Sequence, residues 1–181
     1  MKNKIETSVI ITAENQERFI ERCIKSCLSQ SFKNIEIIII FTKLKNINAL
    51  KRRYLSKNIV FLNIPKKINK PTQDQLFKIK QGLLNSKGKY IFLLDGDDVY
   101  KKDKVKVVMN SIKDQKTLFL HNFENNKNNI KQINKVHGFK ETNLYKTLIN
   151  AWPKGVCTSC IALNRELLKE FFKEIKIKKF I

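Results

Sequence analysis

Short apolar runs alternate with amphipathic segments along most of the chain. The apolar runs, each predicted to form a β-strand, cover residues 7–12, 35–41, 59–64, 90–95 and 117–123. Between them, apolar residues recur every three or four positions, which is the spacing of a helix that buries one face. Alternation of this kind predicts helices packed on a mostly parallel sheet, and therefore an α/β fold.

Polar residues mark where the predicted helices begin. Asn15 is a candidate N-cap for a helix whose apolar face includes Ile20 and Cys23. Pro71-Thr72-x-x-Gln75 has the pattern of a capping box, and Asn164 is a candidate cap for a last helix. A short basic helix is predicted over residues 49–55, and the stretch 125–134 is predicted to be a surface turn.

The most informative stretch ends the run at residues 90–95. Five large apolar residues are followed by Asp95, Gly96, Asp97 and Asp98. The run predicts a strand buried on both faces, with the acidic cluster at its carboxyl end, where open α/β sheets bind ligands. Neighbouring carboxylates repel unless a cation or a proton relieves them, so Asp-x-Asp favours a hard divalent metal shared with substrate phosphates. A solvated acidic turn that caps the next helix is the alternative.

Composition narrows the class of protein. A chain of 181 residues, 42% of them hydrophobic, suits one domain over residues 1–181. The net charge of +21 favours an anionic partner. The basic residues are nearly all Lys and are scattered, and the aromatic residues are mostly Phe within apolar runs, so we expect no nucleic-acid platform. We expect a cytoplasmic protein, with contact at the inner membrane surface as an option.

Four cysteines raise the question of a zinc site. Cys157 and Cys160 have the spacing of half a zinc knuckle, but the sequence has no second pair at matching spacing. Cys23 and Cys27 fall on the inner face of a predicted helix. Reduced thiols in the core are therefore expected, in preference to structural zinc or a disulfide.

Four segments carry a resemblance over nearly the whole chain. Residues 8–15 read Ser-Val-Ile-Ile-Thr-Ala-Glu-Asn, and residues 19–32, 35–42 and 82–98 follow in matching order and spacing. Together they resemble the family 2 glycosyltransferases. That family has the GT-A fold, a Rossmann-like three-layer domain with a mostly parallel central sheet.

The resemblance implies a metal-dependent, inverting transfer of sugar from a nucleotide-diphosphate sugar to a glycan or lipid-linked acceptor, in capsule or lipopolysaccharide biosynthesis. Mn²⁺ or Mg²⁺ would bridge the diphosphate to Asp97, the leading ligand, with Asp95 facing the ribose or the metal and Asp98 as a further ligand. The nucleotide would be lined by the following residues: Thr12, Ala13, Glu14, Asn15, Phe41, Lys80, Asp95 and Gly96.

The chain also departs from the family pattern. Phe41-Thr42 stands where the family has an Asp that reads the base, and Ile79-Lys80 stands where it has Arg-Asn. The segment from Thr158 to Leu168 matches the one before the family's catalytic base, yet no Asp follows it before Ile181. The catalytic residue is therefore unassigned, and we expect either a longer natural chain or a base supplied from elsewhere. Three alternatives stay open: a catalytically silent domain that binds a nucleotide or a partner protein, a transferase of another nucleotide-activated group, and a nucleic-acid-binding module.

Overall fold

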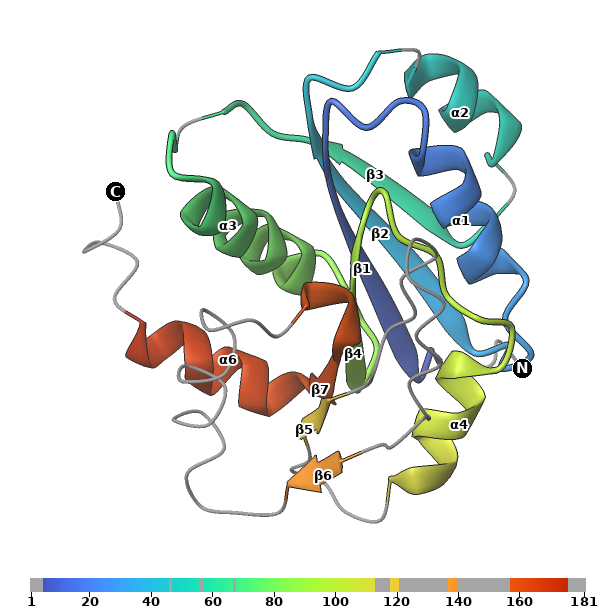
Figure 1. Ribbon diagram of the computed structural model, residues 1–181, viewed down its shortest axis with the longest axis vertical. Helices are drawn as coiled ribbons and strands as arrows, with labels where there is room; N and C mark the ends of the chain where they lie inside the picture. Colours follow the sequence, from blue (N-terminus) through green and yellow to red (C-terminus); the bar gives the residue numbers. More distant parts are fainter. Residues whose placement is uncertain are drawn as a thin grey trace, which may run out of the picture.

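The computed structural model describes residues 5–45, 47–55, 57–66, 68–112, 118–120, 137–139 and 157–175. These residues form one mixed sheet with helices on both faces (Figure 1). The elements, in chain order, are β1 (Thr7–Glu14), α1 (Ile20–Leu28), β2 (Ile35–Thr42), α2 (Ile47–Arg53), β3 (Ile59–Asn63), α3 (Pro71–Leu84), β4 (Tyr90–Asp95), α4 (Lys104–Ser111), β5 (Leu118–Leu120), β6 (His137–Phe139), the 3₁₀ helix η2 (Thr158–Cys160), β7 (Ile161–Asn164) and α6 (Arg165–Glu174).

The strand order within the described residues is β3-β2-β1-β4-β7-β5-β6. Neighbouring strands from β3 to β4 are parallel, whereas β7 runs antiparallel to both β4 and β5, and β6 runs antiparallel to β5. The predicted α/β class with parallel central strands is confirmed. Because β1 to β4 point the same way, their carboxyl ends meet at one edge of the sheet.

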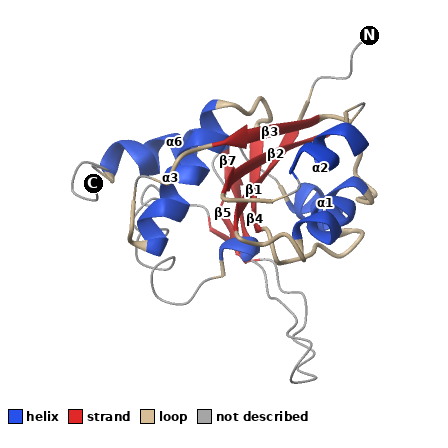
Figure 2. Cartoon of the chain, turned by 90° about the horizontal axis from the view of Figure 1, so that it is seen from above, coloured by secondary structure: helices blue, strands red, loops and turns tan. Residues whose placement is uncertain are grey.

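The sheet is the middle of three layers (Figures 1 and 2). Helices α1, α2 and α4 cover one face, and α3 and α6 cover the other. Successive residues of a strand point to opposite faces, so Ile37 and Ile39 pack in the cluster with α1, while Ile38 and Ile40 pack in the cluster with α3. Burial on both faces is the reason that the central strands read as continuous apolar runs.

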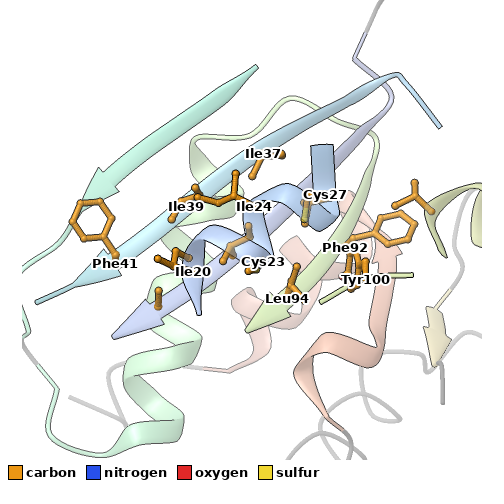
Figure 3. Packing of buried hydrophobic residues seen from close by; sticks show 14 of the residues in the cluster. Ile20, Cys23, Ile24, Cys27, Ile37, Ile39, Phe41, Phe92, Leu94 and Tyr100 are labelled. Atoms are coloured by element: carbon orange, nitrogen blue, oxygen red, sulfur yellow. The ribbon is translucent and has the colours of Figure 1, made fainter. Parts of the chain in front are cut away.

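The α1 face of the core contains the two helical thiols (Figure 3). Cys23 and Cys27 are buried among Ile20, Ile24 and the aromatic ring of Phe92. Both are free cysteines, as predicted. Each fully buried Leu, Ile, Val or Phe side chain contributes about 1.5–3 kcal/mol to the free energy of unfolding, so both faces of the sheet contribute to stability.

Two predicted helix caps are wrong, and one is confirmed. Helix α1 begins at Ile20, and Asn15 lies in the preceding turn with a left-handed φ of 52°. Helix α3 has Lys70 as its N-cap without a side-chain cap, so the capping box is not formed. The Asn164 side chain does cap α6, where it accepts a hydrogen bond from the backbone N–H of Glu166 at 2.8 Å.

Strand and helix boundaries also differ from the expectation at a few places. The short basic helix lies at Ile47–Arg53, two residues earlier than predicted. The strand predicted over residues 117–123 is described only at Leu118–Leu120, and the predicted turn at 125–134 lies outside the described residues. Strands β6 and β7 were not predicted. Within the described ranges, no helix has the length and apolar composition needed to cross a bilayer.

A buried polar network joins the amino ends of β1, β2 and β4. The Glu36 carboxylate accepts hydrogen bonds from the Ser8 hydroxyl at 2.6 Å and from the Gly88 backbone N–H at 3.1 Å. Next to it, the Arg165 guanidinium donates to the Gly88 carbonyl at 2.7 Å and to the Leu83 carbonyl at 3.0 Å. The network fixes the start of α6 against the turn that leads into β4, and so fixes how β7 meets β4.

Candidate functional site

The candidate site lies at the carboxyl edge of β1 and β4. Parallel pairing places Thr12 directly opposite Asp95, the last residue of β4, while β1 continues to Glu14. The chain then turns at Gly96, whose backbone N–H donates to the Thr12 carbonyl at 2.9 Å. Helix α4 begins only at Lys104 with Asp103 as its N-cap, so the acidic turn does not cap that helix.

Asp95 is held by three separate parts of the chain. Its Oδ1 accepts hydrogen bonds from the Thr12 hydroxyl at 3.2 Å and from the Gln75 amide at 2.6 Å. Its backbone N–H donates to the Ser159 hydroxyl at 3.0 Å. The contacts come from β1, α3 and η2, so the carboxylate is oriented before any ligand binds.

The electrostatic environment of Asp95 disfavours its ionised form. Burial raises the pKa of the Asp95 carboxyl to about 6, and the nearby Asp98 and Asp97 carboxylates add to the rise. The hydrogen bonds from Thr12 and Gln75 act in the opposite direction. A bound cation would lower the pKa of Asp95 again, because a nearby positive charge favours the ionised form of each carboxylate around it.

Gly96 is required by the close approach of the turn to the first loop. A Cβ at this position would lie 2.5 Å from Gln16 Oε1 and 2.9 Å from the Ala13 Cβ. The next residue, Asp97, is exposed, and its backbone carbonyl accepts a hydrogen bond from Arg22 at 2.9 Å. The turn is therefore closely packed at Gly96, while Asp97 is exposed to solvent.

Asp98 is half-buried and contacts η2. Its Oδ2 accepts a hydrogen bond from the Ser159 hydroxyl at 2.6 Å and lies 3.8 Å from the Cys157 sulfur. Ser159 thus bridges the Asp95 backbone and the Asp98 carboxylate. The ligand atoms of Asp95, Asp98 and Cys157 all lie within 4.8 Å of one another.

Two carboxylates from the turn and a thiol from the start of η2 converge in a way that fits a divalent cation, because carboxylate oxygens and a deprotonated thiol are all metal ligands. The sequence analysis assigned Asp95, Asp97 and Asp98 to this role but missed Ser159 and Cys157. The Thr158-Ser159 segment and the Cys157-x-x-Cys160 spacing were the sequence signals that pointed to them.

Lys104 and the two cysteines of η2 complete the surroundings of Asp98. The Lys104 ammonium donates to the Ser159 carbonyl at 3.1 Å and lies 4.7 Å from the centre of the Tyr100 ring. Burial lowers the pKa of Lys104 to about 8. A hydrogen bond with Cys160 lowers the pKa of the Cys157 thiol to about 7, against burial, and raises that of the Cys160 thiol. Lys104 stays mainly protonated at neutral pH.

Glu14, predicted to line the nucleotide, forms ion pairs in this structure. Its carboxylate lies 2.5 Å from the Lys66 ammonium and 3.2 Å from that of Lys78, and the Lys66 bond holds the pKa of Glu14 below its usual value. Lys78 also pairs with Asp74 on the same helix. Lys80 lies about 200° around α3 from Lys78, at ~100° per residue, and its assignment stays a prediction.

A second feature lies at the same edge of the sheet, beyond the ends of β1, β2 and β3. It is a pocket of ≈ 410 Å³ lined by Asn15, Phe41, Lys43, Leu44, Lys45, Ile47 and Asn63. Asn15 and Phe41, which the sequence analysis expects to line a nucleotide, both line this pocket. Phe41 is only 2% exposed, so it presents little of its ring to the pocket.

Known proteins resemble this chain in sequence and in fold. The family model described as glycosyl transferase family 2 matches residues 8–43 and 66–176. An uncharacterized glycosyltransferase of Rickettsia conorii is 31% identical over 162 residues, which are 86% of this chain and 26% of that protein. One from Rickettsia felis is 29% identical over 159 residues, 84% of this chain and 25% of that protein. The chain therefore spans about a quarter of the length of these curated relatives.

Solved structures share the fold at low identity. TarS 1–349 of S. aureus in complex with UDP has a TM-score of 0.65 at 17% identity, covering 91% of this chain and 48% of that one. The mannosyltransferase PcManGT of Pyrobaculum calidifontis, in complex with GDP-Man and Mn²⁺, has a TM-score of 0.62 at 14% identity, covering 91% and 46%. At this identity the likeness establishes the fold, which is the predicted GT-A arrangement.

Proposed function

Because the chain belongs to glycosyl transferase family 2, we propose that its carboxyl-edge site binds a nucleoside-diphosphate sugar and transfers the sugar to an acceptor hydroxyl. The observation that carries the proposal is the convergence of Asp95 and Asp98, with Asp97 exposed beside them, at the same edge of the sheet as a pocket beyond the first three strands. An oriented acidic cluster can bind a diphosphate through a cation, and a pocket with both apolar and polar residues can bind the rest of the donor.

The acidic turn would hold the cation, Mn²⁺ or Mg²⁺. Asp97 is the ligand with the freest access, and Asp95 and Asp98 are oriented by Gln75 and Ser159. When bound, the cation would neutralise the negative charge that develops on the leaving diphosphate. The chain's own residues keep the carboxylates fixed, so that little reorganisation is needed when the donor binds.

The pocket beyond the ends of β1, β2 and β3 would take the nucleoside. Its volume of ≈ 410 Å³ lies in the usual range for small-ligand sites, which is about 300–1,000 Å³. Asn15 and Asn63 offer amide donors and acceptors at its wall, and Lys43 and Lys45 add positive charge. Because Phe41 is buried, base recognition would depend on these amides rather than on a ring stacked over the base.

The acceptor and the stereochemistry follow from the family resemblance. By resemblance to that family, the acceptor would be a glycan or a lipid-linked glycan in surface polysaccharide synthesis. The sugar would be transferred with inversion at its anomeric carbon. The net charge of +21 supports an acceptor held at an anionic membrane surface. The catalytic base stays unassigned among the described residues.

Calorimetric titration of UDP, GDP, CDP and TDP, with and without Mn²⁺, tests the proposal. Binding of one nucleotide that needs both the metal and Asp97 is the expected result, and Asp97→Ala should abolish it. Asp103→Ala is the matched control, because Asp103 is an exposed carboxylate in the same loop, at the N-cap of α4. If none of the nucleotides binds to the folded protein, the transferase proposal fails and a silent GT-A domain takes its place.

A further inference from the structure

The acidic turn is accompanied by a thiol. Cys157 Sγ lies 3.8 Å from Asp98 Oδ2, and both lie within 4.8 Å of a ligand atom of Asp95. Ligands bound to one metal ion at about 2.0–2.3 Å are separated by roughly 3–4 Å. Small rotations about side-chain bonds would therefore bring these three atoms onto a single ion.

The backbone fixes Cys157 at this place. Antiparallel pairing of β7 with β4 sets Asn164 opposite Tyr90 and Ala162 opposite Phe92. Helix η2, directly before β7, closes with a hydrogen bond from the Cys160 N–H to the Cys157 carbonyl at 2.9 Å. The pairing of β7 with β4 therefore places the Cys157 sulfur at the carboxyl end of β4.

The two cysteines of η2 differ in access to the cluster. Cys160, the last residue of η2, is 3% exposed and is not part of the cluster, whereas Cys157, the N-cap of η2, is half-buried and has its sulfur in the cluster. Asp95, Asp98 and a Cys157 thiolate would together offer three anionic ligand atoms to one divalent cation, with Asp97 exposed beside them and the Lys104 ammonium nearby.

We propose that Cys157 is a further protein ligand of the metal at this site, beside the aspartates of the acidic turn, and that it gives the site a preference for thiophilic divalent ions such as Zn²⁺, Co²⁺ and Cd²⁺ over Mg²⁺. Mg²⁺ prefers oxygen ligands in an octahedral arrangement, whereas thiolate ligands favour softer ions. The inference rests on the proposed function, because it names the metal class of that same site. Binding replaces the thiol proton by the metal, and the proton is released to solvent.

Metal titration without nucleotide tests the inference separately. Co²⁺ or Cd²⁺ is added to metal-free, reduced protein, and the thiolate-to-metal charge-transfer absorption is followed. The expected result is absorption that saturates at one equivalent. Cys157→Ser should remove it and weaken Cd²⁺ binding at least about tenfold, since loss of even an outer partner of a metal ligand costs about 10–100-fold.

Cys160→Ala is the matched control, because it removes the neighbouring thiol and should leave the absorption in place. A circular dichroism spectrum of each variant verifies its fold. Competition with excess Mg²⁺ should leave Cd²⁺ bound to the wild type but displace it from Cys157→Ser.

Two results would overturn the inference: saturable Cd²⁺ binding without charge-transfer absorption, or absorption that survives Cys157→Ser. Nucleotide binding that needs Mn²⁺ and Asp97 but shows no thiolate signal would defeat this inference and leave the proposed function standing. A thiolate signal in a protein that binds no nucleotide would support the metal site and defeat the transferase proposal.

Discussion

Replacing Asp95 by Asn should stabilise the metal-free protein while it abolishes metal-dependent nucleotide binding. The difference between a pKa of about 6 in the fold and the usual 3.8 corresponds to about 3 kcal/mol, at ~1.36 kcal/mol per pKa unit. Asp95 is partly buried, and solvent screening reduces the effect to about 2–3 kcal/mol. The new amide keeps an oxygen to accept from Thr12 and Gln75, so the two hydrogen bonds survive the change.

The gain should depend on pH in a defined window. A carboxyl whose pKa is raised on folding is protonated in both states below about pH 4, so there it costs nothing. As the pH rises from about 4 to about 6, the unfolded chain ionises this carboxyl freely while the folded protein resists, and stability is lost. The Asp95→Asn variant lacks this loss, so its advantage should be small at pH 4 and full above pH 6.

Urea unfolding at a series of pH values, with a chelator present, measures the difference directly. Asp103→Asn is the control and should follow the wild type within about 0.5 kcal/mol, as exposed substitutions usually do. If Asp95→Asn were no more stable than the wild type at pH 7.5, or if its advantage were the same at pH 4 and pH 7.5, the account of a strained carboxyl would be refuted.

Three further substitutions probe the surroundings of the site. Gly88→Ala places a Cβ 2.5 Å from the Ser8 backbone nitrogen and should cost about 3 kcal/mol in urea unfolding, whereas an unchanged midpoint would mean that the turn yields freely. Ser159→Ala removes the hydroxyl that bonds the Asp95 N–H and the Asp98 carboxylate. It should lower the free energy of unfolding by about 1–3 kcal/mol and weaken Mn²⁺ binding about 10–100-fold in calorimetry. Undiminished Mn²⁺ affinity would argue against the bridging role of Ser159. Arg165→Lys should cost about 1–3 kcal/mol by thermal unfolding, because an ammonium cannot replace the guanidinium fork, and a neutral result would contradict this.

The central strands and the acidic turn follow from sequence because their signal is local. β2 and β4 are buried on both faces, so each appears as an apolar run that no helix pattern interrupts. Asp95 comes directly after such a run, and its place at the carboxyl edge follows from the parallel order of strands. The family resemblance points to the same residues, and their role as metal ligands stays a prediction.

Side chains that depend on distant partners could not be predicted in this way. Gln75 fits the pattern of a capping box, but its side-chain amide donates a hydrogen bond to the Asp95 carboxylate instead. The contact arises because α3 places Gln75 near the end of β4. Ser159 and Cys157 reach the site only through the antiparallel pairing of β7. That strand has four residues and no clear alternation, so nothing in its sequence indicates its partner.

The place of β7 between β4 and β5 also has a consequence for synthesis on the ribosome. β5 is made before β7, yet β7 is what joins it to β4. Until residues 161–164 have left the ribosome, the outer edge of β4 keeps unpaired backbone groups along an apolar strand, which is open to pairing with other nascent chains. Chains stopped before Ile161 should therefore aggregate during translation, while chains that extend past Asn164 can close that edge themselves.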